Sequence, residues 1–411
     1  MFKNYLKITL AVLRRRKFYT FISLFGISMT LMILIVLTSF LDHMFSANYP
    51  NVNSDRTVFV RRMILKKVGP NENSTNSGNL SFNFIENYLM KMQTPEKIGF
   101  TAGGGRETML LGGQNVDVEL KSTDDVFWEI NSFDFLEGKA FTKQNIQSRD
   151  NVMIITDKIR DLLYGQGVLV LGKTLEIQHV NRRIIGVVRG CSSVQFDVWG
   201  DIYLPYTTTK IDLKDPGLQG GFTATLMAKN ESEVGKMKAE FNEIASRIPI
   251  PKDAFYNVIE VKAETVFDIA IQGILGKETL HGVVYLILFG FAVLFMSLPA
   301  INLVNVNISR MLERSSEIGI RKAFGASSGS LVRQFVVENI IISVLGGIIA
   351  VVLAWLFLWF FNHSNIIDHI HLRINWLVGG VAFFLSVVFG LLSGVYPAWR
   401  MSKLHVVDAL K

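Results

Sequence analysis

The hydrophobic positions of this chain gather in four long runs. A helix needs about 20 mainly apolar residues to cross the hydrocarbon core of a bilayer. Four stretches reach that length, and each predicts a membrane-spanning helix: 18–41, 283–306, 335–361 and 377–395. The first is longer than the roughly 7–15 apolar residues of a cleavable signal peptide, so we expect an uncleaved anchor. The alternative for any single run is a buried helix of a soluble domain.

The stretch between the first two runs, 42–281, alternates strand and helix patterns and contains no run of spanning length. Strand patterns occur at 57–62, 152–156, 174–178, 183–188, 223–229 and 257–262, and helix patterns at 82–92 and 232–247. Ser81 is the predicted N-cap of the first helix, which follows a polar loop at 71–79. Two strand–helix–strand units on either side of a strand-rich insertion at about 101–209 predict a compact mixed α/β domain. The predicted fold class is therefore an α+β membrane protein.

Basic residues set the predicted orientation of the helices. They are concentrated at 1–17, at 307–334 and in the tail 396–411, whereas the short connection 362–376 holds only Arg373. Basic flanks remain on the cytoplasmic side of a membrane. We therefore expect both termini and 307–334 to be cytoplasmic, with 42–281 and 362–376 outside. Residues 1–17 have apolar positions at helical spacing and predict an amphipathic helix on the inner surface, or a plain tether.

Composition narrows the class of protein. The chain has 411 residues, of which 49% are hydrophobic and 19% charged, while soluble domains carry about 25% charged residues. A purely soluble enzyme is excluded, and the single cysteine, Cys191, excludes a disulfide scaffold. The net charge of +7 lies largely beside the apolar runs, so we expect contact with membrane lipid and none with nucleic acid.

Two sequence patterns resemble a phosphate-binding loop and a metal site, but we expect neither to bind a ligand. Residues 167–174 fit the phosphate-loop expression G-x-x-x-x-G-K-[ST], but such a loop must open a helix, and a strand pattern follows here. We interpret Gly172 as a turn residue. His363, His369 and His371 cluster in the outer connection without a cysteine, so a solvated loop is favoured over a metal site. We expect no catalytic residue, bound cofactor or metal.

The segment 309–338 carries a short charged helix pattern between two spans. Ser316 is a candidate N-cap, Glu317 and Arg321 are spaced for pairing, and Gly325 is placed to end the helix. A short helix that is fixed at both ends between two spans is well placed to be displaced by a movement of a soluble partner. An ordinary solvated loop is the alternative.

These residues resemble the MacB-type (FtsX-like) ABC transporter permease family. The run Glu313–Ser327 (ERSSEIGIRKAFGAS) is similar to its cytoplasmic signature, and Gly394–Arg400 (GVYPAWR) with Val407–Leu410 (VDAL) resembles its closing motif. In the external stretch, the runs that resemble the family are 135–142, 171–174, 185–188 and 202–206. Trp399 departs from the small or basic residue common in the family, and an interfacial anchor suits it.

The resemblance implies a dimeric permease, homo- or heterodimeric, bound by two ATPase subunits. MacB itself has an ATPase domain ahead of its first span. This chain shows none, so the expected ATPase is a separate subunit that uses the ATP. The external domain would comprise a porter-like part and an inserted, Sabre-like part. Such proteins transmit ATP-driven motion across the bilayer rather than passing cargo through a central pore.

The resemblance points to 314–325 as the coupling helix. Residues assigned to the ATPase-coupling helix are Glu313, Arg314, Glu317, Ile318, Gly319, Arg321, Lys322, Phe324 and Gly325. We expect Glu317, Arg321 and Lys322 to make polar contacts with the ATPase. Ile318 and Phe324 are expected to pack into it or the bilayer face. For Arg321 and Lys322 the alternative role is to set the topology by charge. Small residues at four-residue spacing predict helix contacts, within or between protomers. They are Gly346, Ala350 and Ala354 on one span, and Ser386, Gly390 and Gly394 on the next.

The leading hypothesis is a permease subunit in a bacterial inner membrane that exports a drug, peptide or lipid-linked cargo. An adaptor and an outer-membrane conduit are possible partners. The alternatives are an FtsX-like regulator that activates cell-wall hydrolases and a LolC/LolE-like permease that releases lipoproteins. A membrane enzyme lacks any candidate nucleophile.

Overall fold

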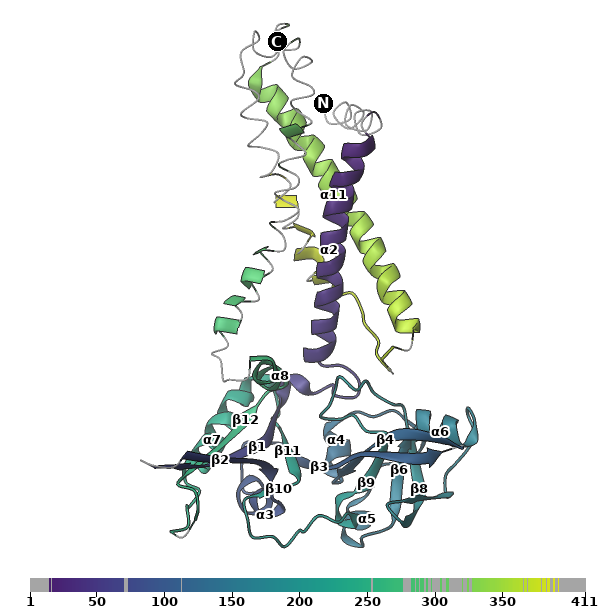
Figure 1. Ribbon diagram of the computed structural model, residues 1–411, viewed down its shortest axis with the longest axis vertical. Helices are drawn as coiled ribbons and strands as arrows, with labels where there is room; N and C mark the ends of the chain where they lie inside the picture. The colour runs from purple at the N-terminus through teal and green to yellow at the C-terminus, as the bar shows by residue number, and fades with distance from the viewer. Residues whose placement is uncertain are drawn as a thin grey trace. The chain divides into compact units, whose positions relative to one another are not determined.

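The computed structural model describes residues 15, 17–69, 73–111, 113–252, 254–275, 327–364, 366–367 and 369–377, with scattered positions in 282–324 and 379–391. The chain divides into two units. We call residues 1–43, 279–366 and 371–411 the helical unit, and residues 44–278 with 367–370 the α/β unit. Figure 1 shows the long helices of the first and the sheet of the second.

Two helices of the helical unit are long and apolar enough to cross a membrane. They are α2 (Lys17–Phe45) and α11 (Ser328–His363), and each contains one of the predicted runs. The α11 helix begins where expected for a capped end, because the Ser327 side chain accepts a hydrogen bond from the Ser330 backbone N–H. Much of 283–306 and 377–395 lies outside the described residues, so the count of four spans stays a prediction.

The two described helices pack through small and branched residues. Ile27 and Leu31 of α2 form a buried cluster with Ile342 and Ala350 of α11. A Cβ atom added to Gly346 would lie 2.8 Å from Ile27 Cγ2, so the glycine permits this close approach. Four hydroxyl side chains of α2 donate to carbonyls of their own helix, and the shortest of these bonds is from Ser39 Oγ to the Ile35 carbonyl at 2.7 Å.

The α/β unit is built on one sheet of 12 strands. The strands are β1 (Thr57–Val68), β2 (Asn73–Leu80), β3 (Lys97–Leu111), β4 (Gln114–Thr123), β5 (Phe135–Gly138), β6 (Val152–Thr156), β7 (Thr174–Ile177), β8 (Val180–Val188), β9 (Ile202–Pro205), β10 (Gln219–Gly220), β11 (Phe222–Met227) and β12 (Val258–Glu264). The helices are α3 (Phe82–Phe84) with a π-helical turn at Ile85–Leu89, α4 (Val126–Ile130), α5 (Lys143–Gln147), α6 (Asp157–Tyr164), α7 (Val234–Ser246) and α8 (Val266–Leu275).

Strand β3 joins two parts of this sheet. Its residues 97–102 pair with β11, and residues 101–111 pair with β4, across a bulge between Gly103 and Gly105. The strands β1, β2, β10, β11 and β12, from both ends of the unit's sequence, form what we call the split part. The strands β4–β9 form the inserted part. The two groups of strands occupy different ends of the unit in Figure 1.

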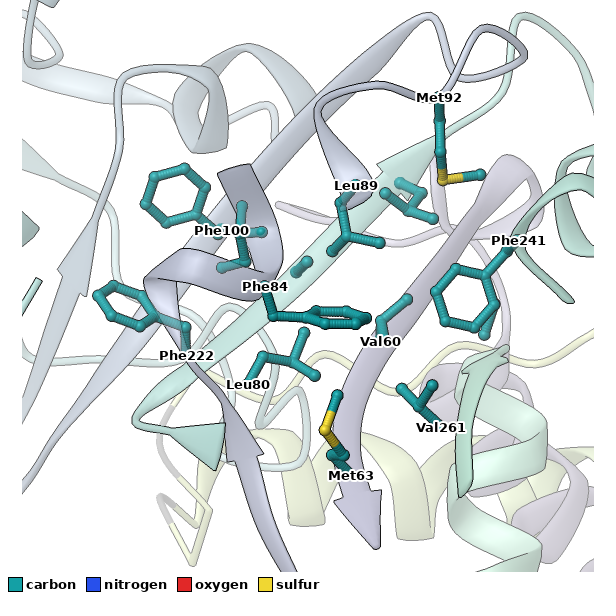
Figure 2. Packing of buried hydrophobic residues seen from close by; sticks show 14 of the residues in the cluster. Val60, Met63, Leu80, Phe84, Leu89, Met92, Phe100, Phe222, Phe241 and Val261 are labelled. Atoms are coloured by element: carbon teal, nitrogen blue, oxygen red, sulfur yellow. The ribbon is translucent and has the colours of Figure 1, made fainter. Parts of the chain in front are cut away.

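Each part buries its own apolar core. In the split part, Phe84, Phe222 and Phe241 are fully buried with Leu80 and Met63 between β-strands and helices α3 and α7 (Figure 2). A second cluster, centred on Ile155, Ile184 and Leu204, belongs to the inserted part. Apolar burial on this scale is the dominant favourable term in folding. Both parts are therefore folded bodies rather than loops on one domain.

Most predicted strands and helices of this unit are confirmed, with one clear error. The strands β6, β7, β8, β11 and β12 occupy the predicted stretches, and Ser81 Oγ accepts from the Phe84 N–H at 3.0 Å as the predicted cap. The prediction of a polar loop at 71–79 is wrong, because residues 73–80 form strand β2. Its side chains are mostly polar and exposed, so the sequence shows no alternation of apolar and polar positions. Backbone pairing with β1 holds the strand in place.

Candidate functional site

Loop 189–199, which leads from β8 toward β9, is where several distant segments of the α/β unit meet. We call it the junction loop. It has no regular strand or helix, yet Cys191, Ser192 and Val198 are buried. A buried loop must satisfy its backbone and side-chain polar groups through specific partners. The partners of this loop define the candidate site.

The segment that follows helix α2 binds the junction loop directly. The Tyr49 hydroxyl donates to the Arg189 carbonyl at 2.7 Å, and it accepts from the Asp134 N–H at 3.3 Å. Two residues later, Asn51 Nδ2 donates to Asp197 Oδ2 at 2.8 Å. Burial raises the pKa of the Tyr49 phenol, so the hydroxyl remains a donor near neutral pH. The chain leaving α2 is thus tied to both ends of the loop.

His369 contacts the same loop, although the sequence places it after α11. The His369 ring lies against Gly190, where an added Cβ would come within 2.5 Å of Nε2. Asp157 Oδ1, at the start of α6, accepts from the Gly190 N–H at 2.9 Å and lies 3.7 Å from His369 Nε2. His369 is therefore half-buried against the junction loop rather than solvated, and Ile370 beside it is buried, whereas His363 and His371 of the predicted solvated loop are exposed.

The junction loop also joins the two parts of the sheet. From β4, Lys121 Nζ donates to the carbonyls of Phe196 and Asp197, at 3.0 and 2.9 Å. From β1, the Arg61 guanidinium lies 4.8 Å from the centre of the Phe196 ring. Burial lowers the pKa of Lys121 and raises that of Asp197, while each charge opposes the shift of the other. A displacement of the loop therefore acts on the split and inserted parts together.

The junction loop contains one thiol, Cys191, together with contacts that link separate segments. Burial raises the pKa of the Cys191 thiol to about 12, so the thiolate that would act as a nucleophile is scarce. Within the described ranges, no group of three or more His, Cys, Asp or Glu side chains is arranged to hold a metal ion. The site offers hydrogen bonds, an ion pair and ring contacts that link separate segments.

The sequence-predicted site residues fall elsewhere. Gly346, Ala350 and Ala354 lie on the buried side of α11. Phe324 is 88% exposed. The remaining predicted residues lie outside the described ones: Glu313, Arg314, Glu317, Ile318, Gly319, Arg321, Lys322, Gly325, Ser386, Gly390 and Gly394.

The phosphate-loop lookalike is a turn, as predicted. Gly172 has φ +83°, and Thr174 opens strand β7 instead of a helix. No helix N-terminus is therefore presented to a phosphate by this motif.

Sequence reasoning missed the junction loop because its partners are distant in the chain. The Tyr49–Arg189 and Asn51–Asp197 contacts join residues 140 and 146 positions apart. The local signal was limited to an apolar, irregular stretch between two strand patterns. No periodicity identifies a partner at that distance.

Comparison with known proteins then identifies the family. Residues 20–244 match the MacB-like periplasmic core domain, and residues 289–406 match the FtsX-like permease C-terminal domain. The chain belongs to the MacB/FtsX-like ABC transporter permease family. The predicted resemblance is confirmed, and the chain is a membrane permease of this family.

Curated relatives of this permease include exporters. It is 25% identical over 324 residues to the pyoverdine export ATP-binding/permease protein PvdT of Pseudomonas syringae pv. tomato, covering 77% of this chain and 46% of PvdT. It is 23% identical to the uncharacterized ABC transporter permease YknZ of Bacillus subtilis, covering 80% and 79%. The macrolide export ATP-binding/permease protein MacB of Neisseria gonorrhoeae is 23% identical, with 75% and 46% covered. The chain thus spans about half the length of PvdT and MacB.

Solved structures with a similar domain include two from this family. The extracellular domain of YknZ from Gram-positive bacteria aligns with 45% of this chain and 91% of its own, at 13% identity and a TM-score of 0.34. The periplasmic region of MacB from Actinobacillus actinomycetemcomitans aligns with 54% and 94%, at 15% identity and a TM-score of 0.35.

Proposed function

We propose that this permease subunit transmits ATP-driven motion from separate ATPase subunits to the α/β unit, for export of a drug, peptide or lipid-linked cargo. The junction loop carries this proposal. The chain leaving α2 and the segment after α11 both contact it, and it in turn contacts both parts of the sheet. A loop with these partners converts a shift of either segment into a shift between the parts.

The motor is proposed to act on the other side of the membrane. Both termini and residues 307–334 are cytoplasmic in this proposal, and 314–325 is the coupling helix. The chain binds no ATP itself and works as a dimer, with an adaptor and an outer-membrane conduit as further partners. The support for a separate ATPase is the relative YknZ, which is named a permease and of which this chain covers 79%.

Export is favoured over regulation by the names of the relatives. PvdT and MacB are described as export proteins. Activation of a cell-wall hydrolase or release of a lipoprotein would need the same transmission step. An experiment on the transmission of motion therefore tests the step that all three functions share, and does not depend on the cargo.

The test uses the full chain assembled with its ATPase subunit in lipid nanodiscs. Spin labels replace Glu176 of the inserted part and Glu231 beside α7, both exposed. ATP should change the distance between the labels in the parent protein. Gly190→Ala should abolish this change while ATP hydrolysis continues, because the new Cβ would collide with the His369 ring.

The matched control is Gly235→Ala in α7, where nothing lies within 4 Å of the added Cβ. It should preserve the ATP-dependent change. An unaltered change in Gly190→Ala would refute transmission through the junction loop. The cytoplasmic end is tested by Arg321→Glu, which should break the link between hydrolysis and label movement, and robust hydrolysis by the isolated chain would contradict a separate motor.

A further inference from the structure

The α/β unit contains a cavity of about 450 Å³. Four segments line it: β3, β4, the turn between β7 and β8, and the chain from β9 to residue 211. Its apolar wall is aliphatic and consists of Leu120, Leu204 and Ile211. Pockets that hold small ligands have volumes of about 300–1,000 Å³ and are lined by apolar groups with a few polar ones. The cavity is therefore large enough for a small molecule.

The turn between β7 and β8 supports a role in binding. Ile177 pairs with Val180, so Gln178 and His179 form a two-residue turn. Both have positive φ, at 54° and 65°. Such a turn favours asparagine and glycine, and other residues in the left-handed region store conformational strain. Both strained residues line the cavity, as expected where their side chains serve a ligand.

The wall formed by β3 and β4 carries unused polar groups. Glu107 of β3 lines the cavity and is half-buried, and its carboxylate forms no ion pair or hydrogen bond with the described residues. Ser122 of β4 also lines the cavity and is 1% exposed. Its hydroxyl has no hydrogen-bond partner in the described part of the chain. Buried polar groups are normally hydrogen-bonded, so this wall retains an unmet capacity for polar contacts.

Positive charge lies on the other side, at the segment after β9. Lys210 lines the cavity, and among the described residues its ammonium group has no partner. Arg182 of β8 is 1% exposed and donates to the Thr208 hydroxyl and carbonyl, at 2.6 and 3.0 Å. No carboxylate of the described ranges pairs with this guanidinium, and its Nε is unpartnered there. Thr208 precedes the lining residue Thr209. A buried cation without a counter-charge favours an anion nearby.

The other charges near the cavity are exposed to water. Glu176 Oε1 lies 3.5 Å from His179 Nδ1, and the two side chains are 62% and 95% exposed. Arg106 and Asp212, which are close in sequence to the two walls, are exposed and do not line the cavity. Water and salt screen such charges strongly. The cavity thus has an acidic pole on β3 and a basic pole after β9.

We propose that this cavity binds a small zwitterion with an aliphatic body, either a free apolar amino acid or a short apolar peptide. The ammonium group of the ligand pairs with Glu107. Its carboxylate faces Lys210, and Arg182 adds positive potential on that side. Its aliphatic part contacts Leu120 and Leu204. A purely anionic ligand is disfavoured by the acidic pole, and a purely cationic one by the basic pole.

The first experiment titrates the full chain in lipid nanodiscs by calorimetry, with empty nanodiscs as the control for binding to lipid. The probes are leucine and trileucine, each also prepared with an acetylated amino end and with an amidated carboxyl end. We expect one unmodified probe to bind more tightly than the other, which distinguishes an amino acid from a peptide as the ligand. Either modification should weaken binding of that probe by about tenfold, because it removes one charge.

Two outcomes of this titration would overturn the proposal. One is that neither unmodified probe binds. The other is that the modified probes bind as tightly as the unmodified one, because the two poles would then recognise no charge.

The second experiment assigns each end of the ligand to one pole. Glu107→Gln should weaken binding of the unmodified probe by about tenfold and leave the acetylated probe at its parent affinity. Lys210→Gln should act in the same way on the amidated probe. The matched controls, Glu231→Gln and Lys252→Gln, change exposed residues outside the cavity and should bind like the parent.

If both cavity variants still discriminate against the modified probes as the parent does, the proposal is wrong. Unfolding temperatures should be unchanged in these variants, which separates lost binding from misfolding. The inference goes beyond the proposed function, because binding here needs neither ATP nor motion. Transmission is measured without these probes, so failure of either proposal leaves the other standing.

Discussion

The two units of this permease place their large apolar side chains in opposite ways. In the α/β unit, Phe84, Phe222 and Phe241 are fully buried. On α11, Trp355 and Phe360 are 56% and 65% exposed, and the buried positions include Ala350 and Ala354. Water drives large apolar groups inward, whereas lipid does not, so helices in lipid associate through small residues that allow close packing. The contrast indicates that the two units are adapted to different solvents.

The largest expected effect is on the buried aromatic core. Phe84→Ala should destabilise the α/β unit by about 3–5 kcal/mol, because it removes a buried ring and leaves a cavity. Thermal unfolding followed by limited proteolysis of the full chain measures the loss. Trp355→Ala is the matched control on the exposed side of α11, and an equal loss there would contradict the contrast between the units.

An intermediate effect is expected where the two helices touch. Gly346→Leu should destabilise the α2–α11 pair by about 1–3 kcal/mol through overpacking, because its Cβ alone would lie within 3 Å of Ile27. A cysteine pair placed across α2 and α11 should crosslink less in this variant. Gly329→Leu, at a position with nothing within 4 Å of the added Cβ, should crosslink normally. Normal crosslinking of Gly346→Leu would contradict the close packing.

A smaller, pH-dependent effect is expected at Asp124. Burial raises the pKa of its carboxyl from 3.8 to about 8, and Oδ1 accepts from the Phe127 N–H at 2.8 Å. The folded protein therefore holds a proton that the unfolded chain has lost between about pH 4 and pH 8, so this group's contribution to stability falls as pH rises through that window.

Asp124→Asn keeps the acceptor and removes the titration. The unfolding temperature of the parent should fall more between pH 5 and pH 8 than that of the variant. Glu240→Gln is a useful comparison, because hydrogen bonds from Gln93 and Thr94 lower the pKa of that more exposed carboxyl. Parallel pH profiles for the parent and Asp124→Asn would contradict a protonated Asp124.

Local patterns predicted much of the fold because the relevant physics is local. The run 335–361 lies within α11 because an apolar stretch of that length is helical in any low-dielectric setting. Strand β6 was predicted to the residue from a short apolar run, and Ser81 from its position before a helix pattern. Strand β2 was not predicted, because its pairing with β1, rather than its own composition, holds it in place.

The sequence by itself determined the class of this protein: apolar runs of spanning length, a mixed α/β region between the first two, and motifs that resemble one permease family. Only the tertiary structure decided that Tyr49, Asn51 and His369 meet at one loop. The reason is physical. Periodicity and composition indicate whether a residue is buried or exposed to its surroundings. Contacts between residues 140 positions apart depend instead on how the strands of the whole sheet are ordered and packed.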